Sequence, residues 1–474
     1  MIDVYSAEQI EAAEKATGDL LTSGALMQRA AAGLAAVILR ELRGADKAPA
    51  RGRRVLLVVG SGNNGGDALW AGVRLRRRGV RVSAWRCGSG VHEEGWAAFT
   101  AAGGREVDAV TALADLPATD LVVDGVIGLG GRAGLKPPVA LFALACRDAD
   151  VPVVAVDLPS GLEADRCGAD ESFHAAVTVT FGGRKPCHVQ QPARARCGRV
   201  EVIDIGLELE DPVLRCWEDA DVVAHWPTPG EHSDKYARGV IGIDAGSAHF
   251  PGAAVLSVGG AVHTGPGMVR YLGSAKDAVV AAFPNVVTAD GRVQAHLLGS
   301  GWGEREGGAE LVEERLGAGV PVLLDADAIG LVCGRRLRED VLLTPHAGEL
   351  ARFLGVERDE VEADPVEHAR RASRESGATV LLKGATQYVA TPDGSVALAV
   401  PGPAWTAQAG SGDTLGGICG TLLAAGLSAR DAALAGASMQ ALAAQANPGP
   451  LPPQDLGERI PEVLVEMLAV AADG

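Results

Sequence analysis

Short apolar runs separated by helical patterns dominate the first half of the chain. Between residues 53 and 206, runs of Val, Leu and Ile alternate with stretches whose apolar residues recur at helical spacing. This alternation predicts βαβ units, and therefore a parallel sheet with helices on both faces. An early helix is predicted over 25–42. The predicted strands are 54–59, 80–85, 121–123, 152–156, 177–181 and 199–205.

The alternation lapses between residues 207 and 238, where the polar, proline-containing stretch H-W-P-T-P-G-E-H (225–232) allows few long elements. We place a domain boundary near residue 222, which gives two α/β domains, 1–221 and 222–474. From Gly412 the second domain has a helical pattern almost throughout. Its predicted strands are 239–244, 296–299, 320–325, 341–344 and 379–382, followed by a hairpin-like segment, 386–400.

Composition excludes several classes of partner. The 43 Lys and Arg residues are outnumbered by 60 Asp and Glu, and the net charge of -17 argues against nucleic acid as the main partner. The eight cysteines show no C-x-x-C pair, which disfavours a zinc site or a disulfide framework. The N-terminal residues do not form a basic region followed by an apolar stretch, and no apolar run is long enough to cross a bilayer. We therefore expect a cytoplasmic protein without a membrane partner.

Polar clusters follow three predicted strands of the first half, where ligands bind in open α/β sheets. Their glycines allow backbone N–H groups to converge on an anion, and a helix beginning near Gly65 adds its positive end. Oxygen atoms of Asn64, Asp124 and Ser160 are suited to surround a cation. One such cluster alone is equally explained by a tight turn and a helix cap, but three together favour a binding site. The clusters are N-N-G-G-D (63–67), D-G-V-I-G-L-G-G-R-A-G (124–134) and D-L-P-S-G (157–161).

The second half places Asp413 between glycines, directly before a long helical pattern. Amides at a helix N-terminus can bind a phosphoryl group, and Asp413 can accept a proton from a nearby hydroxyl. The alternative is that Asp413 only caps the helix. His346, Glu349 and Lys383 also lie at predicted strand ends, and G-S-G-W-G (299–303) is a further glycine-rich turn. Each is usually structural when isolated, but together they favour a nucleotide site.

Four stretches of the first half resemble the N-terminal domain of the bifunctional NAD(P)H-hydrate repair enzymes: S-G-N-N-G-G-D (61–67), Asp124 with G-L-G (128–130), D-L-P-S-G and T-F-G-G-R-K-P (180–186). The resemblance implies a Rossmann-like three-layer epimerase domain that acts on NADHX or NADPHX and binds K⁺. It implies potassium ligands at Asn64, Asp124 and Ser160. The implied substrate contacts are Asn63, Asn64, Gly65, Gly66, Asp67, Gly128, Leu129, Gly130, Gly131, Arg132, Ala133, Gly134 and Asp157.

Two residues depart from that family pattern. Ala68 stands where the family usually has glycine, and Leu129 stands where it has threonine. The lost hydroxyl weakens substrate binding unless the backbone alone does that work. We assign acid or base catalysis in this domain to Asp157.

The second half resembles the family's ribokinase-like, ADP- or ATP-dependent NAD(P)HX dehydratase domain. Its opening motifs are matched by K-Y-A-R-G (235–239) and G-S-A-H-F-P-G-A-A (246–254). Two positions depart from the family pattern: G-S-G-W-G replaces the usual G-P-G-x-G, and Gln387 replaces a common threonine. The resemblance implies hydrate contacts at Ala253, Gly301, His346 and Asp413, and nucleotide contacts at Lys383, Gly384, Ala385, Thr386, Gln387 and Gly412. We expect Mg²⁺ with the nucleotide, and a homo-oligomer.

These features lead to one hypothesis and two alternatives. Asp413 deprotonates the hydroxyl of the hydrate as that hydroxyl takes a phosphoryl group, and loss of phosphate restores the ring. One epimer, the S form, fits the site, and the first domain interconverts the R and S forms. Alternatively, the second half is a small-molecule kinase of the ribokinase-like type, fused to a Rossmann-like module that only senses a nucleotide.

Overall fold

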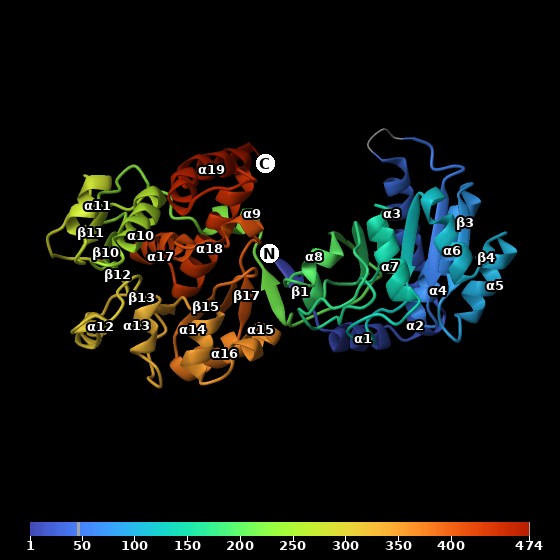
Figure 1. Cartoon of the computed structure of the whole chain (residues 1–474), viewed down its shortest axis with the longest axis horizontal. Coiled ribbons are helices and arrows are strands. Elements are labelled where there is room, and N and C mark those ends of the chain that lie inside the picture. The colour runs from blue at the N-terminus through green and yellow to red at the C-terminus, as the bar shows by residue number, and fades with distance from the viewer. Residues whose placement is uncertain (45–47, 474) are drawn as a thin grey trace. The chain divides into compact units, whose positions relative to one another are not determined.

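The chain folds into two α/β units, each with its own sheet (Figure 1). The computed structural model describes residues 1–44 and 48–473. One unit is Asp3–Val213, and the other joins Met1–Ile2 to the residues from Leu214 onward. The second unit begins earlier than the predicted boundary near residue 222, because β9 (Leu214–Cys216) pairs in parallel with β17 (Val396–Leu398) of its sheet.

The N-terminal unit is built on a seven-stranded sheet with the order β4-β3-β2-β5-β6-β7-β8. Every neighbouring pair is parallel, as predicted. The edge strand β4 was not predicted, because R-E-V is short and two of its three residues are exposed. The strands are β2 (Arg54–Val59), β3 (Arg81–Arg86), β4 (Arg105–Val107), β5 (Leu121–Gly125), β6 (Val153–Val156), β7 (Val177–Phe181) and β8 (Arg199–Ile203). The helices are α1 (Ala7–Ala16), α2 (Asp19–Thr22), α3 (Ala25–Arg43), α4 (Asn63–Arg77), α5 (Glu93–Ala101), α6 (Ala109–Asp115), α7 (Val139–Asp148) and α8 (Arg194–Cys197), with 3-10 turns η1 (Leu116–Ala118) and η2 (Pro186–His188).

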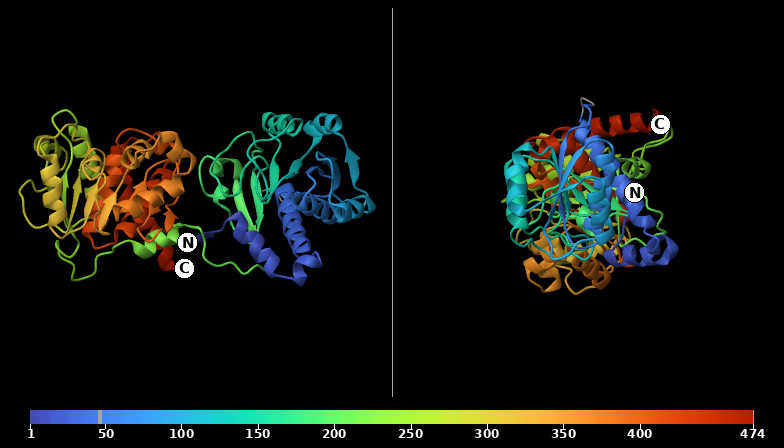
Figure 2. Two further views of the ribbon diagram at one scale, coloured as in Figure 1. Left: turned by 90° about the horizontal axis from the view of Figure 1, so that it is seen from below. Right: turned by 90° about the vertical axis from the view of Figure 1, so that its right-hand side faces the viewer.

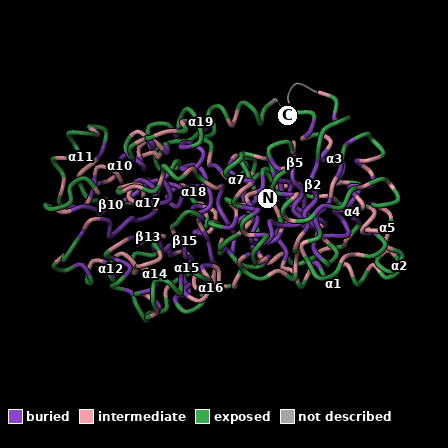
Figure 3. Tube along the Cα trace, turned by 45° about the vertical axis from the view of Figure 1, so that its right-hand side comes forward, coloured by how far each residue is buried: buried purple, intermediate pink, exposed green. Residues whose placement is uncertain are grey.

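Alternate residues of β2 pack on different helical layers, because successive side chains of a strand point to opposite faces. Leu57 belongs to a buried cluster formed with α3 and α4, whereas Leu56 belongs to a second cluster formed with α6 and α7. Figure 2 shows helices flanking the strands, and Figure 3 shows the buried tube along β2 and β5. The predicted three-layer arrangement is therefore confirmed.

The C-terminal unit is built on a ten-stranded sheet with the order β1-β9-β17-β16-β15-β14-β13-β12-β10-β11. The run from β15 to β11 is parallel, and β16 is antiparallel to both neighbours, which confirms the predicted hairpin. The remaining strands are β1 (Ile2–Val4), β10 (Val240–Asp244), β11 (Met268–Tyr271), β12 (Ala295–Leu298), β13 (Val322–Leu324), β14 (Val341–Leu343), β15 (Thr379–Leu382) and β16 (Tyr388–Ala390). The helices are α9 (Asp219–His225), α10 (Pro251–Thr264), α11 (Lys276–Ala282), α12 (Gly308–Gly317), α13 (Asp327–Gly330), α14 (Ala347–Leu354), α15 (Arg358–Ala363), α16 (Pro365–Ser376), α17 (Ser411–Ala424), α18 (Ala429–Ala446) and α19 (Pro453–Asp473), with 3-10 turn η3 (Ala404–Thr406).

Helices α10 and α17 pack very closely, and glycines make this possible. A Cβ added at Gly260 would lie 2.2 Å from the Thr414 carbonyl oxygen, and one added at Gly417 would lie 2.0 Å from that of Ser257. Backbone atoms cannot move aside as a flexible side chain can. This contact therefore helps to hold the first turn of α17, which carries Asp413, against the rest of the unit.

We expect Gly260→Ala to destabilise the C-terminal unit by about 1–3 kcal/mol, the usual cost of overpacking. Gly252→Ala is the matched control, because Gly252 lies on the same helix and a Cβ there would meet nothing within 4 Å. Denaturant unfolding of the two variants measures the difference. Equal stabilities would contradict the close-packing argument.

Among the described residues, no helix has both the length and the apolar character needed to cross a membrane.

Candidate active sites at the two sheet rims

Three loops of the N-terminal unit meet at the carboxyl ends of β2, β5 and β6, which are neighbours in the sheet. The Asp124 carboxylate accepts two hydrogen bonds from Ser160, one from its backbone N–H at 2.7 Å and one from its hydroxyl at 2.6 Å. Asn64 Nδ2 donates to the Val156 carbonyl at 2.7 Å. The structure thus gathers the three predicted potassium ligands at one edge of the sheet, with Asn64 in the first turn of α4, which begins at Asn63, slightly before the predicted start near Gly65.

Several glycines in these loops are required by protein packing, a reason that the sequence did not reveal. A Cβ at Gly60 would lie 1.9 Å from the Val126 carbonyl oxygen, one at Gly65 would lie 2.2 Å from that of Gly60, and one at Gly128 would lie 2.3 Å from Asn64 Oδ1. Gly130, in contrast, is exposed and would meet nothing within 4 Å. Close packing against other protein atoms therefore explains some glycines of this rim, and exposure of the backbone to a ligand explains only the others.

Asp124 is a fully buried carboxylate, and it makes no ion pair within the described parts of the chain. Burial raises its pKa to about 6, although the hydrogen bonds from Ser160 and Val126 act in the opposite direction. A cation beside it would balance the buried charge. The oxygen atoms around Asp124 therefore fit a monovalent cation.

A buried ion pair lies beside this cluster. Lys185 Nζ donates to Asp157 Oδ1 at 2.6 Å, and the Thr180 hydroxyl donates to the same oxygen at 2.9 Å. Asp157 has a φ of 68°, a left-handed conformation that is costly outside glycine and is often found at functional sites. Sequence reasoning missed Lys185, although the lysine of T-F-G-G-R-K-P followed a predicted strand and provided the signal.

The two departures from the family pattern have structural explanations. Leu129 packs against the buried cluster that contains Leu158 and Leu162, so its side chain has an apolar partner in this chain. Ala68 is fully buried, and a Cβ on Gly125 would lie only 2.8 Å from its methyl group. Both residues therefore have packing roles.

The other predicted epimerase residues differ in exposure. Asp67 is only 6% exposed, and Gly66 packs against His92 and Met27. Asn63, Arg132 and Ala133 are exposed, Gly131 is half-buried, and the Gly134 N–H donates to the Gly161 carbonyl at 2.9 Å.

The second rim joins the carboxyl ends of five neighbouring parallel strands, β10, β12, β13, β14 and β15. Lys383, after β15, places its ammonium group 2.6 Å from Asp325 Oδ1, after β13. A Cβ at Gly412 would lie 3.3 Å from the same ammonium nitrogen. The predicted residues Lys383 and Gly412 therefore meet at the N-terminus of α17.

Asp413 lies in the first turn of α17 and is half-buried. Burial and the charge of Asp325 raise the pKa of Asp413 to about 7, while Lys383 and a hydrogen bond with Ser300 limit the rise. A carboxylate with a pKa near neutrality is well matched to accept a proton and to release it again. The geometry therefore gives Asp413 more than the helix-capping role that was its alternative.

Asp325 is the main residue of this rim that sequence reasoning missed. It is 2% exposed and also accepts hydrogen bonds from the hydroxyls of Ser300 at 2.9 Å and Thr344 at 2.8 Å. Its position at the end of the predicted strand 320–325 was the available signal. Ser300 is the residue that replaces the usual proline of the glycine-rich turn, so this departure adds a hydroxyl to the network.

The predicted hydrate contacts surround the same turn. A Cβ at Gly301 would lie 2.5 Å from that of Ala253, so these two residues are adjacent. Next to them lies a cavity of about 460 Å³, a size typical of ligand pockets, lined by Trp302, Gly303 and Arg305 among others. His346 caps α14 through Nδ1, which accepts from the Gly348 N–H at 3.0 Å. The histidine thus has a structural role as well as an exposed ring.

The predicted nucleotide stretch begins at the rim and enters the hairpin. Gly384 and Ala385 are exposed, whereas Thr386 is buried. Gln387 Oε1 is buried and has no hydrogen-bond partner within residues 1–44 and 48–473. That unsatisfied acceptor marks a place where a ligand donor would be favourable.

Comparisons with known proteins agree with this division. Residues 23–187 match the family of YjeF-related protein N-termini, and residues 241–462 match the family described as NAD(P)H-hydrate dehydratase. The chain is 47% identical over 443 residues to the bifunctional NAD(P)H-hydrate repair enzyme of Mycobacterium tuberculosis, with 90% of each chain covered. The chain belongs to the bifunctional NAD(P)H-hydrate repair enzyme family.

Single-domain relatives of this repair enzyme family match each half separately. An NAD(P)H-hydrate epimerase of Clavibacter michiganensis is 40% identical over 231 residues, covering 45% of this chain and 95% of the relative. The second half is also similar to the ADP/ATP-dependent NAD(P)H-hydrate dehydratase from Bacillus subtilis, whose crystal structure was obtained with ATP and Mg²⁺. The two sequences are 26% identical, and the two structures superpose with a TM-score of 0.50. That similarity covers 53% of this chain and 98% of the relative.

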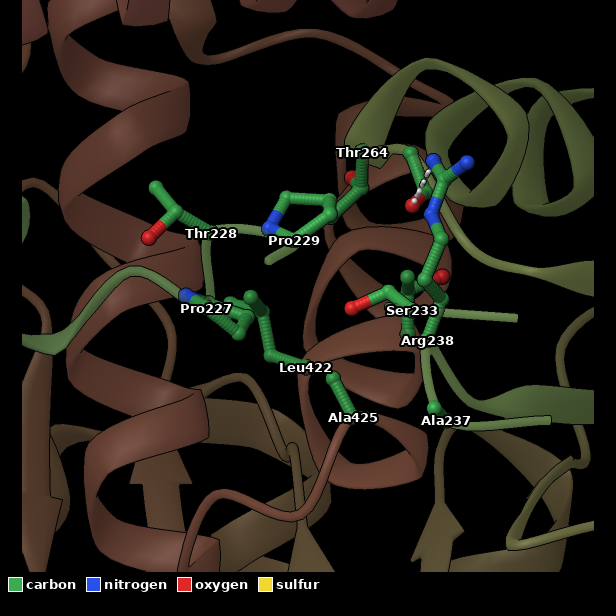
Figure 4. Close-up of a pocket in the computed structure, with 11 residues that line it drawn as sticks. Pro227, Thr228, Pro229, Ser233, Ala237, Arg238, Thr264, Leu422 and Ala425 are labelled. Carbon is green, nitrogen blue, oxygen red and sulfur yellow. Dashed lines mark hydrogen bonds between the residues drawn. The ribbon is translucent and has the colours of Figure 1, made fainter. Parts of the chain in front are cut away.

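A second cavity of the dehydratase unit lies away from the rim (Figure 4). Its lining includes Arg238, which precedes β10, and Ala425, which follows α17, so it lies at the other end of these elements. Its volume of about 70 Å³ is far below that of a nucleotide pocket. It therefore does not compete with the rim as the nucleotide site.

Proposed function

We propose that the two rims divide the repair of hydrated nicotinamide cofactors, with Asp413 as the base of the dehydratase site. The protein is a bifunctional enzyme with an NAD(P)H-hydrate epimerase domain and an NAD(P)H-hydrate dehydratase domain. The observation that carries the residue assignment is the half-buried Asp413 at the start of α17, beside Lys383 and Asp325. The substrates are NADHX and NADPHX, and the S form is the one dehydrated.

The dehydration proceeds in two steps. The substrate hydroxyl gives its proton to Asp413 while its oxygen attacks the terminal phosphorus of ADP or ATP, and the bond from that phosphorus to the nucleotide breaks. Amides at the start of α17 stabilise the transferred phosphoryl charge. The ring nitrogen then expels phosphate from the adjacent carbon, and loss of a proton from the next carbon restores the double bond. Phosphate leaves far more readily than hydroxide, which explains the need for a nucleotide.

Lys383 is suited to contact the nucleotide phosphates. Burial alone would lower its pKa, but the charges of Asp325, Glu349 and Asp413 raise it, so the ammonium group stays charged. Together with the exposed backbone at Gly384 and Ala385, it forms the phosphate end of the proposed nucleotide contacts Lys383 to Gln387. Mg²⁺ would accompany the nucleotide and be held mainly by its phosphates and water.

Potassium would bind in the epimerase domain, held by Asn64, Asp124 and Ser160. The buried Asp124 carboxylate, which has no ion-pair partner in the described part of the chain, and the Ser160 hydroxyl that donates to it support this assignment. The cation would balance the negative charge of Asp124 next to the loop against which the substrate phosphates bind. Asp157 and its neighbours would then transfer the protons of the reaction.

One assay tests the whole proposal. Purified protein is mixed with both NADPHX epimers, Mg²⁺, K⁺ and either ADP or ATP, and the recovery of NADPH absorbance is followed. We expect recovery of both epimers, and recovery of only the S form when Na⁺ replaces K⁺. A phosphorylated product without regained NADPH would instead identify a small-molecule kinase, and epimer exchange that is unaffected by Na⁺ would contradict the potassium assignment.

A further inference from the structure

The side chain of Asp67 is buried at the epimerase rim. It is 6% exposed, and its buried Oδ1 finds no hydrogen-bond partner among the described residues. Asp67 is the fifth residue of α4, and the family resemblance places it at the substrate together with the four residues before it. A buried polar atom left unsatisfied costs stability, and such atoms are often kept for a function.

The surroundings of Asp67 favour its protonated form. Burial raises the pKa of Asp67 well above its usual range, and the nearby charges of Asp157 and Glu14 raise it further. His92 packs against the adjacent Gly66, and Lys185 is the ion-pair partner of Asp157. Asp67 therefore holds a proton more readily in the fold than a free carboxyl group does, and this proton is available for donation.

Asp157 is held in the opposite protonation state. Burial by itself would raise its pKa, but the charge and hydrogen bond of Lys185 outweigh burial and lower the pKa. Two carboxyl groups of one rim thus have environments that separate their proton affinities. This arrangement is the usual sign of an acid and a base that act together.

We propose that Asp67 is the general acid of the epimerase reaction and that the ionised Asp157 is its base. This inference rests on the proposed epimerase function and adds a catalytic group to it. Lys185 then acts as a positioning residue, because it keeps Asp157 ionised and oriented through the 2.6 Å contact.

The reaction balances with these two groups and water. Hydration of an enamine ring puts the hydroxyl on the carbon bonded to nitrogen. Asp67 protonates that hydroxyl, the C–O bond breaks, water leaves, and the nitrogen lone pair forms a C=N bond. Water then adds to the other face of this carbon, the C=N electrons return to nitrogen, and the released proton goes to Asp157. Proton exchange with solvent restores Asp67 and Asp157.

Asp67→Asn in the full-length protein is the first test, because asparagine keeps the shape and removes the proton. We expect epimer exchange, followed by NMR, to fall by about 10²-fold or more, the usual contribution of a general acid. The unfolding temperature of the N-terminal unit should rise, because a carboxyl group whose folded-state pKa is raised opposes folding above its unfolded-state pKa. Exchange at the wild-type rate, or a lowered unfolding temperature, would overturn the proposal. Dehydration of the S epimer by the other domain of the same chain is the control, because regained NADPH absorbance shows that the variant protein is intact.

Glu14→Gln provides a second, independent test. Removing this like charge should lower the pKa of Asp67, so the alkaline limb of the pH profile of epimer exchange should move to lower pH. An unmoved limb would contradict Asp67 as the acid. The wild-type protein in the same assay distinguishes the epimerase function from the role of Asp67. If wild type showed no epimer exchange, the epimerase assignment and this proposal would both be rejected. If wild type and Asp67→Asn exchanged the epimers equally fast, only the role of Asp67 would be rejected.

Discussion

Replacing Asp413 with asparagine is expected to lower kcat for dehydration by about 10²–10⁴-fold, the range in which a general base contributes. Asparagine keeps the shape of the side chain but cannot accept the hydroxyl proton. Recovery of NADPH absorbance from the S epimer measures the loss. The epimerase of the same molecule should keep its full rate.

Asp431→Asn is a matched control for this variant. Asp431 is the third residue of α18, just as Asp413 is the third residue of α17. Among the residues that the structure describes, the Asp431 side chain bonds only to the neighbouring Ser428 and Arg430. Dehydration by Asp431→Asn should equal that of wild type. If Asp413→Asn retained most of the wild-type kcat, Asp413 would be only a helix cap.

The pH profile provides a second readout of Asp413. Because burial and the charge of Asp325 raise the pKa of Asp413 to about 7, kcat/KM for dehydration should rise as pH increases to that value and then level off. The base must be ionised to work, so activity is lost on the acidic side. Ser300→Ala removes a hydrogen bond that lowers this pKa, and it should move the acidic limb to higher pH.

Replacing Lys185 with methionine is expected to destabilise the N-terminal unit by about 3–5 kcal/mol at pH 7, because it leaves Asp157 as an uncompensated buried charge. The two side chains of this pair are only 1% and 5% exposed. Denaturant unfolding of this unit measures the change. Epimer exchange should fall as well, since Asp157 then loses the cation that orients it and stabilises its ionised form.

The pH dependence of this difference has a defined sign. The pKa of Asp157 is lowered in the wild-type fold, so the pair stabilises the protein above the unfolded-state pKa and loses this contribution as pH falls through the folded-state pKa. In Lys185→Met, Asp157 can become neutral, so the gap between variant and wild type should shrink toward acid pH. Arg105→Met is the control, because it removes a pair whose side chains are 64% and 44% exposed, worth about 0–1 kcal/mol. Equal losses in the two variants would contradict the argument.

The two halves, their sheets and the edges that carry the sites were predictable from the sequence. Apolar runs such as 54–59 and 177–181 are strands in the structure with these bounds, because residues buried on both faces of a parallel sheet leave a pattern that needs no knowledge of their partners. Polar residues directly after such runs must lie at the carboxyl edge of the sheet. For this reason the sequence alone predicts that Asp124, Asp157 and Lys383 lie at the rims.

Only the tertiary structure decided which side chains meet there. Lys185 pairs with Asp157, and Asp325 with Lys383, across intervals that no local pattern spans. The short strand β9 belongs to the second sheet because of its partner β17, which lies far along the chain. Gly60 and Gly260 are glycines because distant backbone atoms approach them. Local propensity and periodicity record the burial of each residue, whereas pairing, close approach and proton affinity depend on neighbours that only the folded chain supplies.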